Sequence, residues 1–209
     1  MILPSIYGYK PQLVYDDVLH LCEIGVSCFH FDIFDESVDK QPYSGLQDIA
    51  FFEELFDKYS IKKNIHIVSR YPQKYFPLIL EKKIEEVILH PGLLDKSEIS
   101  KYILYLQNHG IQVGLSLYED FCEYINLPLD FIHVCNYDYI HGQKLSDKQV
   151  SNKLSILNRT NKPILVDGGV CCDNIALYKT SGASSFVCGR SIFDHNQLES
   201  YLQLMNLIQ

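Results

Sequence analysis

The chain has 209 residues, of which 47% are hydrophobic and 21% are charged. This balance is typical of a globular protein and excludes wholesale disorder and a coiled coil. Eighteen Lys and Arg residues against 26 Asp and Glu residues give a net charge of −8. Such an acidic balance argues against a nucleic-acid-binding surface, although it leaves room for a small local anion site.

Short apolar segments of strand type alternate with stretches of helical periodicity along the chain. In chain order, the predicted strands are Ile2–Ser5, Cys28–Ile33, Asn64–Val68, Val87–His90, Gln112–Leu117, Phe131–Cys135, Ile164–Val166 and Ser185–Cys188. The helices predicted to follow them are Val14–Ile24, Ile49–Tyr59, Gln73–Lys82, Ser97–Asn108, Phe121–Ile125, Asp147–Leu157, Asp173–Thr180 and Gln197–Asn206. Ser97 is the expected N-cap of its helix, because a serine hydroxyl can accept a hydrogen bond from the first turn.

Eight strand–helix units in strict alternation predict a parallel sheet with crossover helices. About 26 residues per unit are enough to close a (β/α)8 TIM barrel, and no linker or low-complexity tract divides the chain. We therefore predict an α/β protein with a single barrel domain spanning residues 1–209. The alternative, an open doubly wound sheet, would place a G-x-G-x-x-G turn after the first strand, where this chain reads Ser5-Ile6-Tyr7-Gly8-Tyr9-Lys10.

Three features of the sequence predict a cytoplasmic protein that does not enter a membrane. No apolar run approaches the ~18 residues that a membrane-spanning helix needs. The first ten residues, MILPSIYGYK, lack the basic and long apolar regions of a signal peptide. The seven cysteines are scattered and form no C-x-x-C pair, which favours reduced thiols over disulfides or a structural zinc site.

Ionisable residues gather where the predicted strands end, which is where function collects in a TIM barrel. His30 and Asp32 lie two residues apart on one strand, so their side chains point to the same face. His66 on the next strand and Asp167 after the seventh complete a set of two histidines and two carboxylates. These donors suit Zn²⁺, and also Mn²⁺, Fe²⁺ or Co²⁺. His133, in the middle of a strand, is expected to pack inside the barrel rather than to bind a metal.

Glycines follow the last two predicted strands, in Asp167-Gly168-Gly169 and in Gly189-Arg190. In this architecture the corresponding loops frequently bind a phosphate through backbone N–H groups. Glycine lets the backbone approach the anion closely, and Arg190 could add a charge-assisted hydrogen bond. A pair of glycines alone is weak evidence, since turns also need glycine, but its position in the barrel strengthens the prediction.

Several segments, taken in order, carry a recognisable pattern: Pro4-Ser5-Ile6, His30-Phe31-Asp32-Ile33-Phe34-Asp35, Asn64-Ile65-His66-Ile67, Val166-Asp167-Gly168-Gly169-Val170 and Val187-Cys188-Gly189-Arg190-Ser191-Ile192-Phe193. Together they resemble the ribulose-phosphate 3-epimerase family, from Pro4 to about Asp194. The resemblance implies a barrel of the ribulose-phosphate-binding type and an isomerase of the pentose phosphate pathway. It also implies a homo-oligomer, either a dimer or a hexamer.

The resemblance further implies a role for each matched residue. One divalent metal ion, with Zn²⁺ the first expectation, would be held by His30, Asp32, His66 and Asp167. Asp32 and Asp167 would also be the two acid/base groups that move a proton between opposite faces of the reacting carbon, through a metal-stabilised enediolate. The expected substrate-binding residues are Ser5, His141, Gly142, Gly168, Gly169, Gly189 and Arg190. The default reaction is the conversion of D-ribulose 5-phosphate into D-xylulose 5-phosphate.

The chain departs from the family pattern around the substrate. Methionines that usually line the metal site are expected at positions occupied here by Phe34, Val68 and Cys135. The Gly-rich loop after the sixth strand is replaced by residues 137–143, in which only Gly142-Gln143 survives. These changes leave two alternatives open: the same chemistry on another sugar phosphate, such as the hexulose phosphate D-allulose 6-phosphate, or a non-catalytic barrel that binds a phosphate metabolite. The second predicts the loss of a metal ligand or carboxylate, whereas all four are present.

Overall fold

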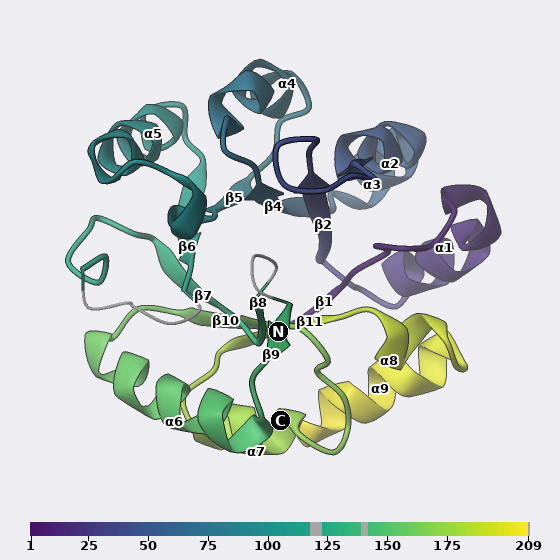
Figure 1. Ribbon diagram of the computed structural model, residues 1–209. Helices are drawn as coiled ribbons and strands as arrows, with labels where there is room; N and C mark the ends of the chain where they lie inside the picture. Colours follow the sequence, from purple (N-terminus) through teal and green to yellow (C-terminus); the bar gives the residue numbers. More distant parts are fainter. Residues whose placement is uncertain (118–122, 139–141, 209) are drawn as a thin grey trace.

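The structure is a computed structural model that describes residues 1–117, 123–138 and 142–208 (Figure 1). Its strands are β1 (Ile2–Pro4), β2 (Cys28–Phe34), β3 (Tyr43–Ser44), β4 (Lys62–Val68), β5 (Glu86–Leu89), β6 (Gln112–Ser116), β7 (Phe131–Cys135), β8 (Tyr137–Asp138), β9 (Gln143–Lys144), β10 (Ile164–Asp167) and β11 (Ser185–Cys188). Its α-helices are α1 (Tyr15–Glu23), α2 (Gly45–Phe51), α3 (Glu53–Tyr59), α4 (Phe76–Glu81), α5 (Lys96–Asn108), α6 (Asp147–Leu157), α7 (Ile175–Thr180), α8 (Arg190–Phe193) and α9 (Gln197–Leu207). The 3-10 helices are η1 (Pro11–Leu13), η2 (Pro72–Tyr75), η3 (Pro91–Leu93) and η4 (Asn158–Thr160).

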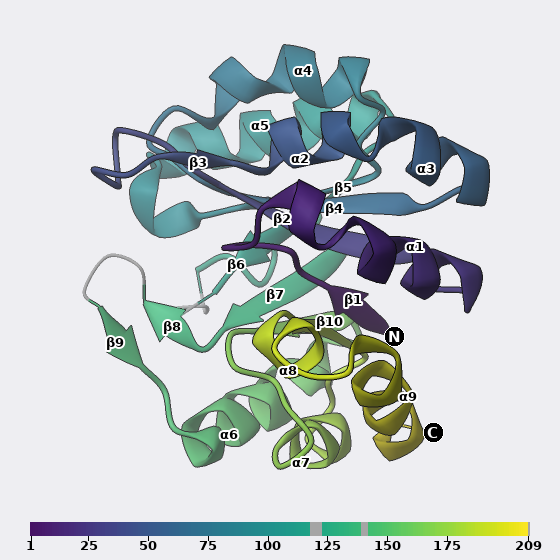
Figure 2. The same ribbon diagram turned by 90° about the vertical axis from the view of Figure 1, so that its right-hand side faces the viewer.

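The predicted TIM barrel is confirmed. The main sheet has the order β1-β11-β10-β7-β6-β5-β4-β2-β3, in which neighbours pair in parallel except for the short antiparallel pair β2–β3. A parallel bridge between Ser5 and His30 joins the first strand to β2 and closes the ring. In Figure 1 the helices surround this ring of strands, and Figure 2 shows β8 and β9 projecting from one end of it. That end is where the barrel strands terminate, so it is the mouth at which function is expected.

The pleat of β2 shows how one strand serves two layers. All seven of its residues are buried, because one face points into the barrel and the other points toward the helices. Phe29, Phe31 and Ile33 belong to the large apolar core between strands and helices. Cys28 faces inward and packs with one residue from each of several other strands, namely Leu3, Ile88, Phe131, Leu165 and Val187. This inner apolar layer seals the floor of the barrel, and the polar residues of β2 lie above it.

Two expectations about helices need correction. The helix predicted at Ile49–Tyr59 begins at Gly45 and is interrupted at Phe52, whose φ of −95° and ψ of 8° leave the helical region while its ring stacks on Phe56. Ser97 is not an N-cap: α5 begins at Lys96, and the carbonyl of Asp95 accepts from Glu98 and Ile99.

The segment Phe121–Ile125, predicted as a short helix, lies partly outside the described residues, and its described part forms a turn. The two-residue strands β3, β8 and β9 and the single-turn helix α8 were not predicted, because elements this short carry no periodicity. Among residues 1–117, 123–138 and 142–208, no helix has both the length and the apolar character needed to cross a bilayer.

Candidate active site

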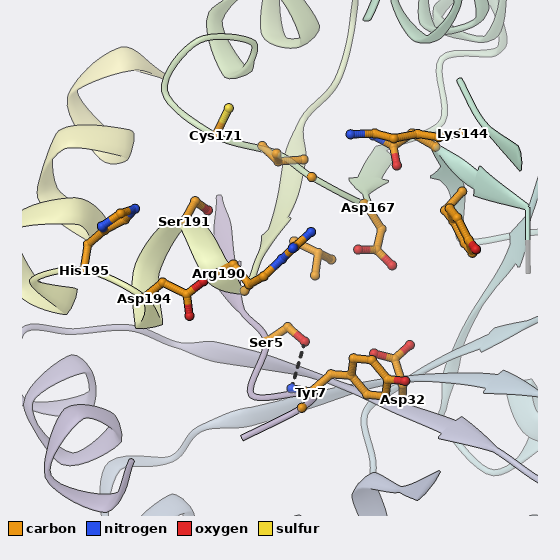
Figure 3. Close-up of a pocket in the computed structure, with 18 residues that line it drawn as sticks. Ser5, Tyr7, Asp32, Lys144, Asp167, Cys171, Arg190, Ser191, Asp194 and His195 are labelled. Atoms are coloured by element: carbon orange, nitrogen blue, oxygen red, sulfur yellow. Dashed lines mark hydrogen bonds between the residues drawn. The ribbon is translucent and has the colours of Figure 1, made fainter. Parts of the chain in front are cut away.

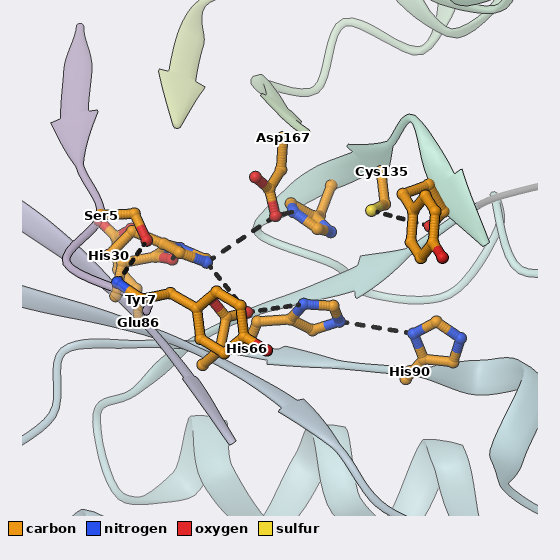
Figure 4. A network of polar contacts seen from close by, with 12 residues as sticks. Ser5, Tyr7, His30, His66, Glu86, His90, Cys135 and Asp167 are labelled. Carbon is orange, nitrogen blue, oxygen red and sulfur yellow. Dashed lines mark hydrogen bonds and ion pairs between the residues drawn. The ribbon is translucent and has the colours of Figure 1, made fainter. Parts of the chain in front are cut away.

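The register between β2 and β4 brings the predicted metal ligands together. His30 pairs with Asn64, and Asp32 pairs with His66. Residues directly opposite on adjacent strands point to the same face, so these four side chains all enter the barrel interior. Asp167 ends β10 on the other side of the ring and points toward them (Figure 4).

The four predicted ligands converge as the sequence led us to expect. One donor atom from each of His30, Asp32, His66 and Asp167 lies within 4.8 Å of the others, and all four residues are buried. Asp32 Oδ1 lies 3.4 Å from both His30 Nε2 and His66 Nδ1. His30 Nε2 lies 3.9 Å from Asp167 Oδ2. This is the compact arrangement that a single ion would need.

The polar atoms at the centre of the cluster fit a divalent cation. His30 Nε2 and Asp32 Oδ1 are buried and have no hydrogen-bond partner among the described residues. A buried polar atom without a partner is costly, and a cation between these atoms would remove that cost. Two imidazoles and two carboxylates are the donors that bind Zn²⁺ and its first-row neighbours. The residues present could therefore hold a metal, and they do not distinguish one ion from another.

Contacts outside the cluster orient the ligands. His30 Nδ1 lies 2.7 Å from Asn64 Oδ1, and the amide nitrogen of Asn64 donates to Glu86 Oε2 at 2.7 Å. Because the amide oxygen can only accept, His30 must carry a hydrogen on Nδ1, and in the neutral imidazole the Nε2 lone pair then faces the cluster. Such outer contacts fix the tautomer and ring orientation of metal-binding histidines. On the neighbouring strand β4, His66 Nε2 lies 3.4 Å from Nδ1 of His90, the last residue of the strand predicted at Val87–His90.

Mutual attraction governs ionisation inside the cluster. Burial favours neutral His30, but the Asp32 and Asp167 carboxylates outweigh it and raise the pKa of His30 to about 9. Burial likewise opposes ionisation of Asp32 and Asp167. Neighbouring histidines outweigh that effect in both cases. His30 and His66 lower the pKa of Asp32, and His133 and His30 lower the pKa of Asp167. Both carboxylates are therefore suited to act as ionised bases or ligands.

A cavity of about 820 Å³ opens above the cluster (Figure 3). Most of the substrate-binding residues predicted from the sequence line it, namely Ser5, Gly168, Gly169, Gly189 and Arg190, together with Asp32 and Asp167. Gly142 is not among the described residues that line the cavity, and His141 lies outside the described residues. The roles assigned to these two residues stay predictions.

The loop after β10 depends on its glycines. Gly168 has a φ of +97°, and a Cβ there would lie 2.0 Å from the side-chain oxygen of Asn136. Gly169 has a φ of +69°, and a Cβ there would lie 3.1 Å from Lys144 Nζ. Left-handed backbone favours glycine, and Gly168 could not accommodate a side chain without displacing Asn136. These glycines bring the backbone of the loop to the cavity surface.

Several residues of the site were missed or discounted from the sequence. The cavity is also lined by Tyr7, Asn136 and Lys144. None of these three residues was predicted to be functional. Lys144 follows the surviving Gly142-Gln143 pair, which was the only available signal. His133 was expected to be a packing residue, and it is fully buried. Its Nε2 nevertheless lies 3.4 Å from Asp167 Oδ2, and burial lowers the pKa of His133 to about 4.

Comparison with known proteins identifies the family of this chain. Residues 1–193 match the model of a family described as "Ribulose-phosphate 3 epimerase family". The chain belongs to the ribulose-phosphate 3-epimerase family. Membership makes it an isomerase, an epimerase of carbohydrate metabolism, and implies a sugar phosphate as substrate. A curated ribulose-phosphate 3-epimerase from Serratia marcescens is 24% identical over 206 residues, covering 92% of this chain and 95% of the relative.

Solved structures support the fold. Thiamine phosphate pyrophosphorylase from Pyrococcus furiosus superimposes with a TM-score of 0.69 at 14% identity, covering 99% of this chain and 94% of the other. 3-Hexulose-6-phosphate synthase from Salmonella typhimurium gives a TM-score of 0.68 at 15% identity, covering 99% and 97%. At such identities the likeness concerns the barrel alone. The site of this epimerase-family member therefore has to be argued from its own residues.

Proposed function

We propose that this epimerase-family protein is a metal-dependent 3-epimerase of a ketose phosphate, with D-ribulose 5-phosphate and D-xylulose 5-phosphate as its substrate pair. The observation that carries the proposal is the placement of two carboxylates beside a buried histidine pair. Asp32 comes from β2 and Asp167 from β10, and both line the same cavity at the barrel mouth.

Epimerisation next to a ketone requires removal of a proton from one face of the carbon and delivery of a proton to the other. Asp32 and Asp167 enter the cavity from different strands, so a carbon held between them could present one face to each. In each direction one carboxylate takes the proton while the other carboxyl supplies one. A bound divalent ion, held by His30, Asp32, His66 and Asp167, would supply Lewis-acid stabilisation of the charge that develops on the ketone oxygen.

The remaining cavity residues would fix the substrate. The backbone of Gly168, Gly169 and Gly189 would bind the phosphate, with Arg190 giving a charge-assisted hydrogen bond. Ser5 would contact the substrate near its carbonyl end. Lys144 extends the proposal, because Figure 3 shows it pointing into the cavity from the side of β9, close to Gly169. Binding the phosphate at one end would set the position of the reacting carbon relative to the two carboxylates.

The two-base assignment is tested by Asp32→Asn and Asp167→Asn. Each variant keeps the side-chain volume but loses a base on one face, so epimerisation should be abolished while circular dichroism reports a folded barrel. Metal content should be measured as well, since each substitution also removes a ligand. Retention of more than a few per cent of wild-type kcat by either variant would refute the assignment.

A hexulose phosphate such as D-allulose 6-phosphate is the second candidate substrate, and the altered cavity wall is the observation that supports it. Tyr7, Tyr137, Lys144 and Arg190 all line it, so its surface is more aromatic and more cationic than glycine loops alone would give. A panel of five-, six- and seven-carbon ketose phosphates decides between the substrates. Equal or better turnover of a longer ketose phosphate would overturn ribulose 5-phosphate as the substrate.

Other parts of the proposal are carried by family membership and by the sequence. They are Zn²⁺ as the ion, a role in the pentose phosphate pathway, a cytoplasmic location and a homo-oligomer of two or six chains. The non-catalytic barrel is disfavoured, because His30, Asp32, His66 and Asp167 converge on one point.

A further inference from the structure

His133 is enclosed in the barrel interior beside the candidate metal site. Its side chain is fully buried on β7, and neither ring nitrogen has a hydrogen bond of ordinary geometry among the described residues. The ring lies nearly parallel to that of His30, with centroids 6.3 Å apart, and packs against His66 with centroids 4.8 Å apart. An imidazole in such a position is costly as mere packing, since its nitrogens lose their contacts with water.

The carboxylate of Asp167 gives His133 a polar neighbour. His133 Nε2 lies 3.4 Å from Asp167 Oδ2, slightly beyond a normal hydrogen bond. A carboxylate oxygen can only accept, so the contact is favourable when His133 carries a hydrogen on Nε2.

The geometry separates His133 from the ligand set. The group of donor atoms that lie within 4.8 Å of one another contains His30, Asp32, His66 and Asp167, and it does not contain His133. Asp167 Oδ2 lies 3.9 Å from His30 Nε2 in the cluster and 3.4 Å from His133 Nε2. Because a carboxylate oxygen has more than one lone pair, Oδ2 can accept a hydrogen bond from His133 and still face the cluster. Metal-binding carboxylates are usually held in this way by a donor that does not touch the metal.

We propose that His133 is a positioning residue that donates Nε2–H to Asp167 Oδ2 and holds this carboxylate in the orientation needed for metal binding. The same contact would orient Asp167 toward the reacting carbon, a consequence that rests on the proposed function. The metal-binding part does not depend on it and can be measured without any substrate.

The test compares His133→Gln with His133→Leu. The Gln amide can still donate a hydrogen bond near the position of Nε2, whereas Leu fills space without donating. Apo protein is titrated with Co²⁺ in competition with a chromogenic chelator, and visible absorption spectra are recorded for the loaded forms. His109→Leu is the matched control, because His109 is exposed and its side chain contacts the backbone carbonyl and the ring of Tyr105, away from the cluster.

We expect His133→Leu to weaken Co²⁺ binding by roughly 10- to 100-fold, the usual cost of losing an outer contact, and His133→Gln to stay within about threefold of wild type. The Co²⁺ absorption bands of the Gln variant should match those of wild type, because no ligand has changed. If the Leu variant does not fold, His133→Met replaces it as a flexible apolar substitute.

Three results would overturn the inference. Altered Co²⁺ bands in the Gln variant would make His133 a ligand rather than a positioning residue. Equal losses of affinity in the Gln and apolar variants would reduce its role to shape. Unchanged affinity in all variants would remove any role in metal binding. If the wild-type protein epimerises no ketose phosphate, the proposed function is contradicted, but the result on metal binding does not depend on that activity.

Discussion

Asp35 illustrates how a residue next to the site supports it without entering the chemistry. The Asp35 carboxylate accepts a hydrogen bond from the backbone N–H of Ser37 at 2.9 Å. It also accepts from the hydroxyl of Ser69 and forms a 2.9 Å ion pair with Lys74, so it ties the loop after β2 to the loop after β4. Burial alone would raise the pKa of Asp35, but these donors outweigh it and lower the pKa to about 2.

This lowered pKa predicts a pH-dependent loss of stability in Asp35→Asn. A depressed carboxyl pKa adds stability at pH values above its ordinary 3.8 and loses it as the pH falls toward about 2. The variant should therefore lose about 2 kcal/mol of unfolding free energy at neutral pH, and the gap to wild type should narrow between pH 4 and pH 2. Urea denaturation across this range measures it, with the exposed Asp39→Asn as control. A gap that stays constant with pH would contradict the account.

Two cationic side chains predict a charge-dependent grip on phosphate. Arg190→Ser and Lys144→Met should each raise KM about tenfold with little change in kcat, because a charge-assisted hydrogen bond contributes roughly 1.5–3 kcal/mol. Inhibition by inorganic phosphate should weaken in parallel. Lys148→Met, at an exposed position on α6, is the control for the loss of a positive charge. An unchanged KM in the Arg190 variant would mean that the guanidinium of Arg190 faces solvent and does not bind the substrate.

At the scale of elements, the barrel strands could be predicted and their register could not. Apolar runs bounded by turns identified the strands, as for Phe131–Cys135, where prediction and structure coincide. The pairing of His30 with Asn64, by contrast, depends on how β2 and β4 slide past one another, which no local pattern specifies. The role of Asn64 in orienting His30 was therefore visible only once the register was known. The split at Phe52 escaped prediction for a related reason, since tertiary packing overrides helical periodicity there.

The β10 loop supplies a prediction about glycine. Gly168→Ala combines left-handed strain with a Cβ that would lie 2.0 Å from Asn136, whereas Gly110→Ala at a φ of +80° meets no atom within 4 Å. Gly110→Ala should cost roughly 1–2 kcal/mol from backbone strain alone. Gly168→Ala should cost more than this control in denaturant unfolding and should also raise KM, because the loop must move. Equal stability losses with unchanged KM would show that this loop neither contacts Asn136 tightly nor binds the substrate.

At the scale of the whole molecule, the candidate metal site joins parts of the chain that are far apart in sequence. His30 and His66 lie in the first third of the chain, and Asp167 lies in β10, across the barrel. The four ligands were predicted from the sequence because histidines and aspartates recur at the ends of the predicted strands. The distances between them and their shared burial could be known only from the closed ring. In that ring, the bridge between Ser5 and His30 lies directly beside the cluster. The single domain over residues 1–209 stays a prediction, and coincident unfolding curves from two probes would test it.

A metal that binds the folded barrel and not the unfolded chain should stabilise the whole molecule. At a free-ion concentration about 100 times Kd the gain is about 2.7 kcal/mol, which raises the Tm of a chain of this size by about 5–10 °C. Removal of the ion with a chelator should reverse the shift. In His66→Gln, which removes one ligand, the shift should shrink greatly, whereas His109→Gln, at an exposed position, should behave as wild type. If none of Zn²⁺, Mn²⁺, Fe²⁺ and Co²⁺ raises the Tm, the result would contradict a metal site formed by these residues.

Proton exchange in D2O, followed by NMR, tests the central claim most directly. Metal-loaded protein is incubated with D-ribulose 5-phosphate, and the C3 position is monitored together with the appearance of D-xylulose 5-phosphate. The account predicts that deuterium enters at C3 as the epimer forms, because Asp32 and Asp167 act on opposite faces of that carbon. Absence of exchange with the metal bound, both for this substrate and for a hexulose phosphate, would contradict it.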